Sequence, residues 1–393
     1  METPERWVVL VCVAVRMIVS LSFPQLQQQL DKSVEFSTPF TSYRSLREGV
    51  YMLKQGFELY NGGVIHHSPL LVVLMSLIEP EFLVSLLYAC LDALIAYQLA
   101  CIARCFSKSI TIPAWIPCLL YSLNPLALLS CVSRSSVIFT NVCISTAVLH
   151  ALQGNVLVAS VAIATAGYLS LYPLLLVFPL FAIFETRSSR VKAAAITSFT
   201  VAVLLTLSYT ACGNNWAFLD ATYGSLVRFD KLFPNLGLWW YFFAEMFDAY
   251  VPFFKAVFNI VVVSFIAPLT VRFYRQPCYA FVLCVGWITL TKPYPTLGDA
   301  GFLLGFLPLF HPLFGYLRYS ALSCLLFLHA VVLSPIFYHL WVDLGSGNSN
   351  FFYAITLVYA LAIASIVADL CWAMLRFEYD HGKPNYQLKV TQI

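Results

Sequence analysis

Long hydrophobic runs recur along the chain from one end to the other, and short polar segments separate them. Each run approaches the roughly 20 residues that an α-helix needs to cross a bilayer. The pattern predicts about ten to thirteen membrane-spanning helices. The least ambiguous runs cover residues 7–23, 81–103, 116–132, 136–153, 156–170, 172–185, 193–212, 239–270, 278–290, 321–333 and 351–377. An all-α, polytopic helical membrane bundle is therefore expected.

Several hydrophobic segments are short or interrupted by proline and glycine, notably 70–78, 301–312 and 335–344. Interrupted helices persist at membrane depth only where protein or water satisfies the freed backbone groups. These segments therefore point to an internal cavity, although a connector packed between helices explains each of them equally well. The first run contains Arg16 and no small-residue cleavage pattern follows it, so we interpret it as a retained helix rather than a signal peptide.

Basic residues gather at alternate ends of successive runs, where few acidic residues accompany them. Such clusters are typical of the cytoplasmic ends of membrane helices. They comprise Arg104 and Lys108, then Arg187, Arg190 and Lys192, then Arg272 and Arg275, and finally Arg376, Lys383 and Lys389. This orientation places segments 24–68, 213–238 and 345–350 on the opposite, luminal side. It also makes residues 378–393 a short cytoplasmic tail.

The composition agrees with a membrane protein and excludes other classes. Of the 393 residues, 60% are hydrophobic and 10% are charged, whereas a soluble domain carries about 25% charged residues. The formal net charge of +3 is too small, and the Lys and Arg residues are too scattered, for a nucleic-acid interface. We therefore expect one multispanning membrane domain over residues 1–393, with a luminal loop at 24–68.

The luminal loop carries charges of both signs and the pattern of an amphipathic helix over 42–55. Asp31 and Glu35 could share one face of a helix, but Pro39 and the residues before it argue against a continuous helix there. The adjacent His66 and His67 would not converge on one ligand from a helix or a strand, so no metal site is expected. A hydrogen bond from either His to a sugar or phosphate is the alternative.

Twelve cysteines are present, nearly all within hydrophobic runs, which favours packing over chemistry. Cys101 and Cys105 are four residues apart, but no His, Asp or Glu nearby completes a tetrahedral metal site. Cys131 and Cys212 lie close to expected luminal ends, and the sequence leaves open whether they pair. No metal ligand is assigned.

Two acidic residues stand in hydrophobic surroundings, Glu245 in WWYFFAEMF and Asp299 in KPYPTLGD. A charge inside a membrane domain usually faces the bundle interior with a partner. Lys292 and Arg318 are plausible partners, which would give a structural ion pair, and contact with a lipid headgroup is the alternative. The aromatic residues around Glu245 also suit an interfacial belt.

The most polar feature near the end of the chain is the turn 345–350, GSGNSN, directly before the last long run. Asn348 can cap the following helix, and a helix N-terminus that opens to the lumen suits phosphate or sugar hydroxyl groups. An ordinary capped turn is the simpler alternative. At the cytoplasmic side, the cluster of Arg187, Arg190 and Lys192 either attracts anionic lipid headgroups or only fixes the topology.

Length, span number and a long first luminal loop are features shared with membrane glycosyltransferases that use dolichol-phosphate sugars. Those enzymes need acidic residues just after the first helix, typically Asp-x-Asp or Glu-x-Asp, to bind a metal ion or act as a base. Here the stretch reads Ser33-Val34-Glu35, with a single carboxylate. The residues therefore indicate a glycosyltransferase shape without its catalytic pair, and no catalytic residue is assigned.

Strings spread over almost the whole chain resemble the phosphatidylinositol-glycan class U family, a subunit of the glycosylphosphatidylinositol (GPI) transamidase. They include YNGGVIHHSPLL, FPNLGLWWYFFAEMF, KPYPTLGD and the long HLWVDLGSGNSNFFYAITL. The resemblance implies a multi-pass protein of the endoplasmic reticulum membrane, with a bundle similar to dolichol-phosphate-mannose-dependent (GT-C type) glycosyltransferases. It implies no catalysis and no cofactor for this chain, because transamidation belongs to a caspase-like cysteine subunit of the same complex.

The same resemblance implies that the chain helps to recognise the GPI lipid. Contact with the anchor is carried over to the turn before the last helix, so Asn348 and Asn350 are the expected GPI-lipid-binding residues, and Lys192 is a secondary contact for anionic lipid. The expected partners are the other transamidase subunits, the GPI lipid and membrane phospholipids. Two alternatives stay open: a GPI-precursor mannosyltransferase that depends on Glu35, and a purely structural scaffold of the complex.

Overall fold

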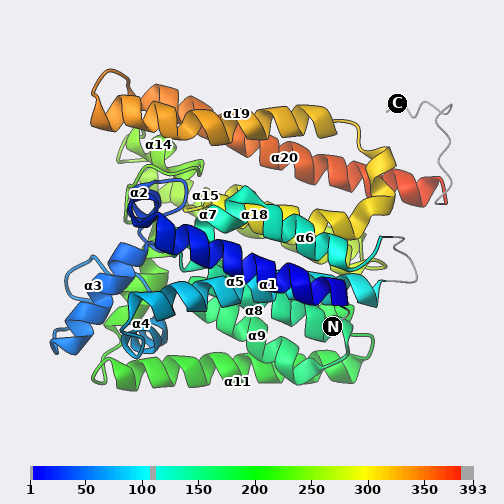
Figure 1. The fold of residues 1–393 in the computed structure, drawn as a ribbon, viewed down its shortest axis with the longest axis horizontal. Helices are drawn as coiled ribbons and strands as arrows, with labels where there is room; N and C mark the ends of the chain where they lie inside the picture. Colours follow the sequence, from blue (N-terminus) through cyan, green and yellow to red (C-terminus); the bar gives the residue numbers. More distant parts are fainter. Residues whose placement is uncertain (1–2, 107–111, 382–393) are drawn as a thin grey trace. The chain divides into compact units, whose positions relative to one another are not determined.

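The computed structural model describes residues 3–106 and 112–381. Within these residues the chain forms helices and turns and contains no strand, which confirms the all-α expectation. By their internal contacts the residues divide into two compact units, Met1–Pro308 and Leu309–Ile393 (Figure 1). Lys108, Lys383, Lys389 and most of the expected tail 378–393 lie outside the described residues.

The first unit contains most of the helices. In chain order they are α1 (Thr3–Ser22), α2 (Pro24–Lys32), α3 (Tyr43–Lys54), α4 (Pro69–Ser76), α5 (Glu81–Cys105), α6 (Trp115–Leu123), α7 (Pro125–Val132), α8 (Val137–Leu152), α9 (Val156–Ser170), η1 (Tyr172–Leu176), α10 (Val177–Ile183), α11 (Arg187–Ala211), α12 (Ala217–Leu219), η2 (Asp220–Gly224), α13 (Ser225–Arg228), α14 (Trp239–Ala244), α15 (Val251–Ser264), α16 (Ile266–Arg272), α17 (Pro277–Thr291) and α18 (Leu297–Phe306). The 3₁₀ segment η3 (Leu307–Tyr316) contains the boundary between the units, and α19 (Ser320–Tyr338), η4 (His339–Asp343) and α20 (Ser349–Tyr379) follow.

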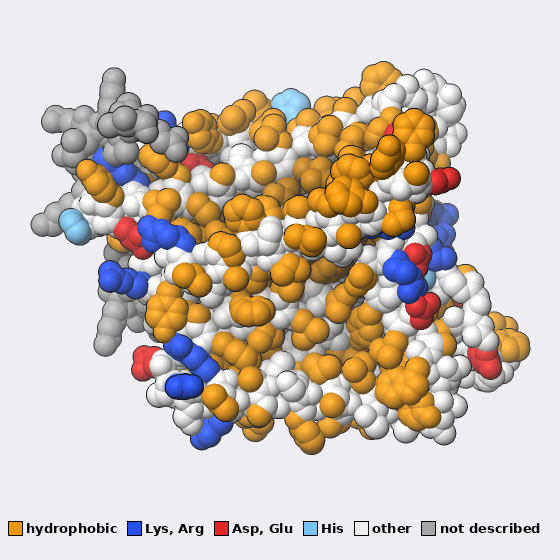
Figure 2. Space-filling view, turned by 180° about the vertical axis from the view of Figure 1, so that it is seen from behind, with side chains coloured by type: hydrophobic (Ala, Val, Ile, Leu, Met, Phe, Trp, Pro, Cys, Tyr) orange, Lys and Arg blue, Asp and Glu red, His pale blue; other side chains and the backbone are white. Residues whose placement is uncertain are grey.

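Six helices in the described part of the chain are long and apolar enough to cross a membrane, or up to eight if the two bent pairs count as spans. Four further apolar helices have only 10–17 residues. Length and composition therefore support six to eight spans, fewer than the number predicted from the hydrophobic runs. Hydrophobic side chains cover most of the face drawn in Figure 2, and Lys, Arg, Asp and Glu lie at its edges.

The interior of the first unit is built around α5. This helix packs against α1, α6 and α8, and the series continues from α8 to α9 and from α9 to α11. The apolar window of α5 is 61% buried, whereas that of α11 is 17% buried. Because lipid tails are as apolar as a protein core, the exposed hydrophobic side of α11 suits contact with the bilayer.

Two predicted runs are broken by bends. The run 116–132 forms α6 and α7, which meet at 59°, because Pro125 stands at the start of α7 and cannot continue the preceding helix. Asn124 caps α7 by accepting a hydrogen bond from the backbone N–H of Leu126 at 3.0 Å. The run 239–270 forms α14, α15 and α16 in place of one span.

The segment 24–68 is folded rather than extended. The expected amphipathic helix is confirmed as α3, which packs on α4 and is capped by the Ser42 hydroxyl. The helix α2 ends at Lys32, so Asp31 is helical and Glu35 is not. This confirms that no continuous helix joins the two acids.

The second unit is a pair of helices, α19 and α20, joined by η4 and the turn 345–350. The two helices lie side by side in Figure 1. The Ser323 and Ser365 hydroxyl groups hydrogen-bond each other at 2.8 Å between them. The break expected around residues 335–344 comes later than Pro335, because α19 passes through this proline and ends at Tyr338.

Candidate functional site

The turn before α20 carries the two residues expected to contact lipid. The side-chain oxygen of Asn348 accepts hydrogen bonds from the backbone N–H groups of Asn350, at 3.0 Å, and Phe351, at 3.3 Å. These contacts satisfy two of the free N–H groups in the first turn of the helix and confirm the predicted cap. Both Asn348 and Asn350 are exposed, so their side chains are accessible from solvent.

The backbone of this turn is held from inside. Gly345 adopts a left-handed conformation, with φ of +61°, which favours glycine. The N–H groups of Ser346 and Gly347 then both donate to the carbonyl oxygen of Leu340, at 3.0 and 2.9 Å. The two Asn side chains are therefore displayed on an ordered turn rather than on an open loop.

Aromatic rings lie next to the turn. Trp341 stacks on Phe352 with 6.2 Å between ring centroids, and Tyr338 meets the same ring edge-on at 5.3 Å. Rings with a polar edge combine apolar contact with hydrogen bonding, which suits a boundary between lipid and water. Chemically, the turn offers neutral amides and aromatic faces, a combination that binds hydroxyl-rich groups without a fixed charge.

Lys192 lies in the first unit, whereas the turn that carries Asn348 and Asn350 lies in the second unit. Lys192 is exposed on α11, close in sequence to Arg187, which is also exposed. Arg190 of the same cluster is partly occupied by protein: its guanidinium donates to the carbonyl of Phe184 at 2.8 Å and to the Tyr274 hydroxyl at 2.6 Å. Lys192 and Arg187 therefore remain the members of this cluster that are open to an anionic surface.

Of the two interpretations of Asp299, the structure contains the ion pair with Lys292. Lys292 Nζ lies 2.7 Å from Asp299 Oδ1, and Asp299 Oδ2 accepts from the backbone N–H and the hydroxyl of Thr296, at 2.8 and 2.9 Å. Both charged groups line a pocket of about 70 Å³, together with Leu71 and Phe302. These last two residues belong to the interrupted segments 70–78 and 301–312, for which a cavity and a packed connector were the two interpretations.

Glu245 has a different environment from Asp299. It is exposed at the end of α14. Arg318, the other cation considered as a partner, lies in the second unit, where its guanidinium stands over the Trp372 ring at 4.9 Å. The interpretation of Glu245 as part of an interfacial aromatic belt therefore suits its exposure better than a buried ion pair.

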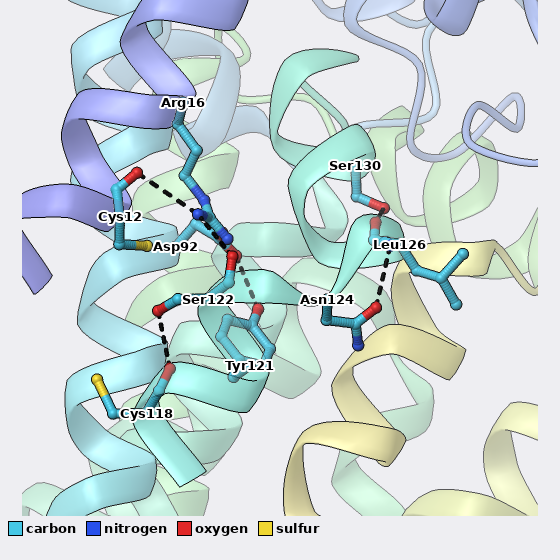
Figure 3. Close-up of polar contacts among 9 residues, drawn as sticks. All are labelled: Cys12, Arg16, Asp92, Cys118, Tyr121, Ser122, Asn124, Leu126 and Ser130. Carbon is cyan, nitrogen blue, oxygen red and sulfur yellow. Dashed lines mark hydrogen bonds and ion pairs between the residues drawn. The ribbon is translucent and has the colours of Figure 1, made fainter. Parts of the chain in front are cut away.

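A second buried charge pair connects α1 and α5, and sequence reasoning did not find it. Arg16 Nε donates to Asp92 Oδ2, and the Tyr121 hydroxyl donates to Asp92 Oδ1 at 2.7 Å (Figure 3). In the sequence, Arg16 stands out only as an interruption of the first hydrophobic run. The available signal was Asp92 itself, an acidic residue inside a hydrophobic run, which needs an internal partner.

The acidic residues of segment 24–68 are engaged in holding local structure. The Asp31 carboxylate is buried and accepts from the backbone N–H of Tyr43 at 2.9 Å, at the first residue of α3. Glu35 is buried as well and accepts from the Ser33 hydroxyl. A carboxylate that binds a sugar acceptor or acts as a base must be free to contact the substrate, whereas both of these carboxylates accept hydrogen bonds from the protein itself.

The two adjacent histidines are also structural. His66 Nδ1 donates to the carbonyl of Ala221 at 2.6 Å, and His67 Nε2 donates to the carbonyl of Ser42 at 2.9 Å. Burial lowers the pKa of both rings, that of His67 to about 4. Each ring is therefore neutral and connects its loop to a distant backbone segment. These hydrogen bonds explain the presence of both histidines without a bound ligand.

The described residues contain no group of three or more His, Cys, Asp or Glu side chains arranged to hold a metal ion. Cys131 is buried and Cys212 is half-buried, and each carries a free thiol. The pairing left open by the sequence is therefore absent between these two described residues.

Comparison with known proteins places this architecture in a family. Residues 10–359 match the family model of "GPI transamidase subunit PIG-U". The chain is 58% identical to the GPI transamidase component GAB1 of Saccharomyces cerevisiae, with 100% of both chains aligned. It is 32% identical to the GPI-anchor transamidase component PIGU of Homo sapiens, with 97% of this chain and 96% of the human protein aligned. The chain therefore belongs to the PIG-U family of GPI transamidase subunits.

Proposed function

We propose that this chain is a non-catalytic subunit of the GPI transamidase complex, in the endoplasmic reticulum membrane, and that it presents the GPI lipid for transfer. The relatives are named components of that transamidase. The expected partners are the other subunits, including the caspase-like catalytic subunit, together with the GPI lipid and membrane phospholipids.

The observation that carries the proposal is the ordered turn with two exposed Asn side chains. Inositol and glucosamine carry several hydroxyl groups and the anchor carries phosphate, so neutral amides can hydrogen-bond the headgroup without holding it as an ion pair. A lipid that must leave after transfer is better served by such moderate contacts. Lys192 and Arg187 provide a weaker, charge-based attraction for anionic lipid.

The buried acids support a role without catalysis in this subunit. A mannosyltransferase of the GT-C type needs acidic residues that reach the acceptor after the first helix. Here Asp31 holds the start of α3, and Glu35 is buried beside Ser33. The mannosyltransferase alternative requires one of these carboxylates to give up its present hydrogen bonds before it can act.

The test separates lipid contact from helix capping. Asn350→Ala leaves the Asn348 cap in place, since only the backbone of Asn350 takes part in it. Asn348→Ser keeps a side-chain cap but removes the amide. We expect the double variant to assemble with its partners and to need about fivefold to tenfold more GPI lipid for half-maximal attachment, as expected for the loss of one or two hydrogen bonds.

A matched control exists at the start of α9. Asn155 is an exposed cap whose side-chain oxygen accepts from the backbone N–H of Val158 at 3.4 Å. Asn155→Ser repeats the cap exchange away from the turn and should leave the lipid requirement unchanged. If the double variant at the turn assembles normally and shows the same lipid dependence as the unaltered complex, the turn does not bind lipid and the scaffold alternative is favoured.

A further inference from the structure

A second polar pocket lies in the first unit, at the end where α1 finishes and α2 and α3 begin. Its volume is about 420 Å³. It is lined by the end of α1, by α2 from its first residue to its last, by the first turns of α3 and α5, and by the residue two positions after α7. Its charged lining residues are Lys32, Arg44, Arg47, Arg134, Asp31 and Glu81. Four cations therefore face two anions.

The two carboxylates differ in how they are engaged by the protein. Asp31 is committed to the backbone N–H of Tyr43. Glu81 is exposed and bridges two arginines, with 3.9 Å to Arg47 Nη1 and 3.6 Å to Arg134 Nη2. These distances are longer than those of a charge-assisted hydrogen bond. Two guanidinium groups thus converge on one exchangeable anion.

Arg134 is the fixed part of this arrangement. Its side chain is 6% exposed, and its guanidinium stands over the Tyr43 ring at 5.0 Å while Nη2 donates to the Ser85 hydroxyl at 3.0 Å. Nε is buried and has no hydrogen-bond partner among the described residues. A buried arginine that is held in place beside a pocket, with one donor unused and another only 3.6 Å from an exposed carboxylate, is suited to an oxygen-rich anion.

The backbone conformation at Arg134 is also unusual. Its φ is +56°, and the N–H of Ser135 donates to the carbonyl of Ser130 at 3.2 Å across the end of α7. This left-handed position after a helix is normally filled by glycine. Arginine adopts this conformation at some cost, and the contacts of its side chain with Tyr43 and Ser85 hold it there.

The rim of the pocket is hydrophobic. Leu21 is 52% exposed and Phe82 is 51% exposed, and both line the pocket. One helical turn before Leu21, Ile18 is 60% exposed on α1. A polar pocket that opens beside an exposed apolar helix face matches a lipid, whose headgroup and acyl chains need these two environments.

We propose that this pocket binds the phosphate of an anionic membrane lipid between Arg47 and Arg134, with the lipid's acyl chains along α1. The phosphate displaces the Glu81 carboxylate from the two guanidinium groups. The site is independent of the Asn348 turn, which belongs to the other unit.

Binding is tested with the full chain, together with its co-purifying subunits, in nanodiscs of phosphatidylcholine with or without phosphatidylinositol. Native mass spectrometry counts the retained phosphatidylinositol, and titration gives its affinity. Arg134→Gly removes the guanidinium and relieves the backbone strain, and affinity should fall about tenfold. Arg47→Gln, at an exposed position, should weaken binding about threefold. Glu81→Gln should strengthen binding, because it removes the competing carboxylate.

Arg6→Gln is the matched control, since Arg6 is exposed near the other end of α1. It should not change the affinity. Equal phosphatidylinositol retention by the unaltered chain, Arg134→Gly and Arg47→Gln would overturn the proposal. So would a site that binds inorganic phosphate but shows no preference between the two nanodisc compositions, because the ligand would then be the free anion.

Discussion

Arg16 and Asp92 form an ion pair between α1 and α5 in which neither side chain has any exposed surface. Tyr121 supplies a further hydrogen bond to Asp92, and the carbonyl of Ser122 accepts from Arg16 Nη1 at 3.3 Å. The pair therefore fixes three helices, α1, α5 and α6, at one point in the interior.

Replacing one member of this pair should lower the free energy of unfolding more than replacing both members. Arg16→Met leaves the Asp92 charge buried, and we expect the free energy of unfolding to fall by about 3–5 kcal/mol. The double variant Arg16→Met with Asp92→Leu removes both charges and should recover much of that loss. Thermal unfolding of the purified chain in one detergent measures both. Equal destabilisation by the single and double variants would show that the charges are not coupled.

The pKa of His67 predicts a loss of stability in acid. Burial lowers this pKa to about 4 from the ordinary value of 6.5, so between these values the unfolded chain binds more protons than the folded chain. Stability from neutral His67 is complete above about pH 6.5 and falls by up to about 1.4 kcal/mol per pH unit as the pH drops toward 4. His67→Gln does not titrate, and its melting temperature should depend less on pH over this interval. Parallel pH profiles for the two proteins would contradict the assignment.

Asp369 of α20 holds the start of α19. Its carboxylate accepts from the backbone N–H groups of Arg318, at 2.9 and 3.1 Å, and Tyr319, at 2.9 Å. Asp369→Ala leaves these N–H groups without their acceptor and should cost about 2 kcal/mol, whereas Asp369→Asn retains one oxygen and should cost less. Hydrogen exchange in the first turn of α19 reports the change. Unchanged protection in the Ala variant would contradict this role.

The cap at Asn348 predicts a measurable effect apart from lipid. Asn348→Ala should destabilise the first turn of α20 by about 1 kcal/mol, while Asn348→Ser should be close to neutral. Circular dichroism during thermal unfolding compares the two variants. An Ala variant as stable as the Ser variant would mean that the cap contributes little.

Local patterns in the sequence predicted several features correctly. The hydrophobic runs located most helices, and capping rules identified Asn348. Of the two cations considered as ion-pair partners, Lys292 pairs with Asp299, seven residues after it in the chain. The Arg16–Asp92 pair joins residues 76 positions apart, and the pocket at Arg134 combines five separate segments. Their geometry is set by how the helices pack, which no local pattern encodes. The bend at Pro125 is different, because the proline that breaks the run 116–132 is itself a local signal.

Lipid presentation, the central claim, predicts where the GPI pathway stops when this chain is removed. The measurement is the lipid precursor and the proprotein in cells depleted of the chain. We expect complete, fully mannosylated GPI lipid to accumulate together with proprotein that retains its attachment signal, because lipid assembly never depended on this subunit. Accumulation of an under-mannosylated precursor would contradict the account. If the unaltered chain then restores complete mannosylation and the Glu35→Gln variant does not, the chain is a mannosyltransferase.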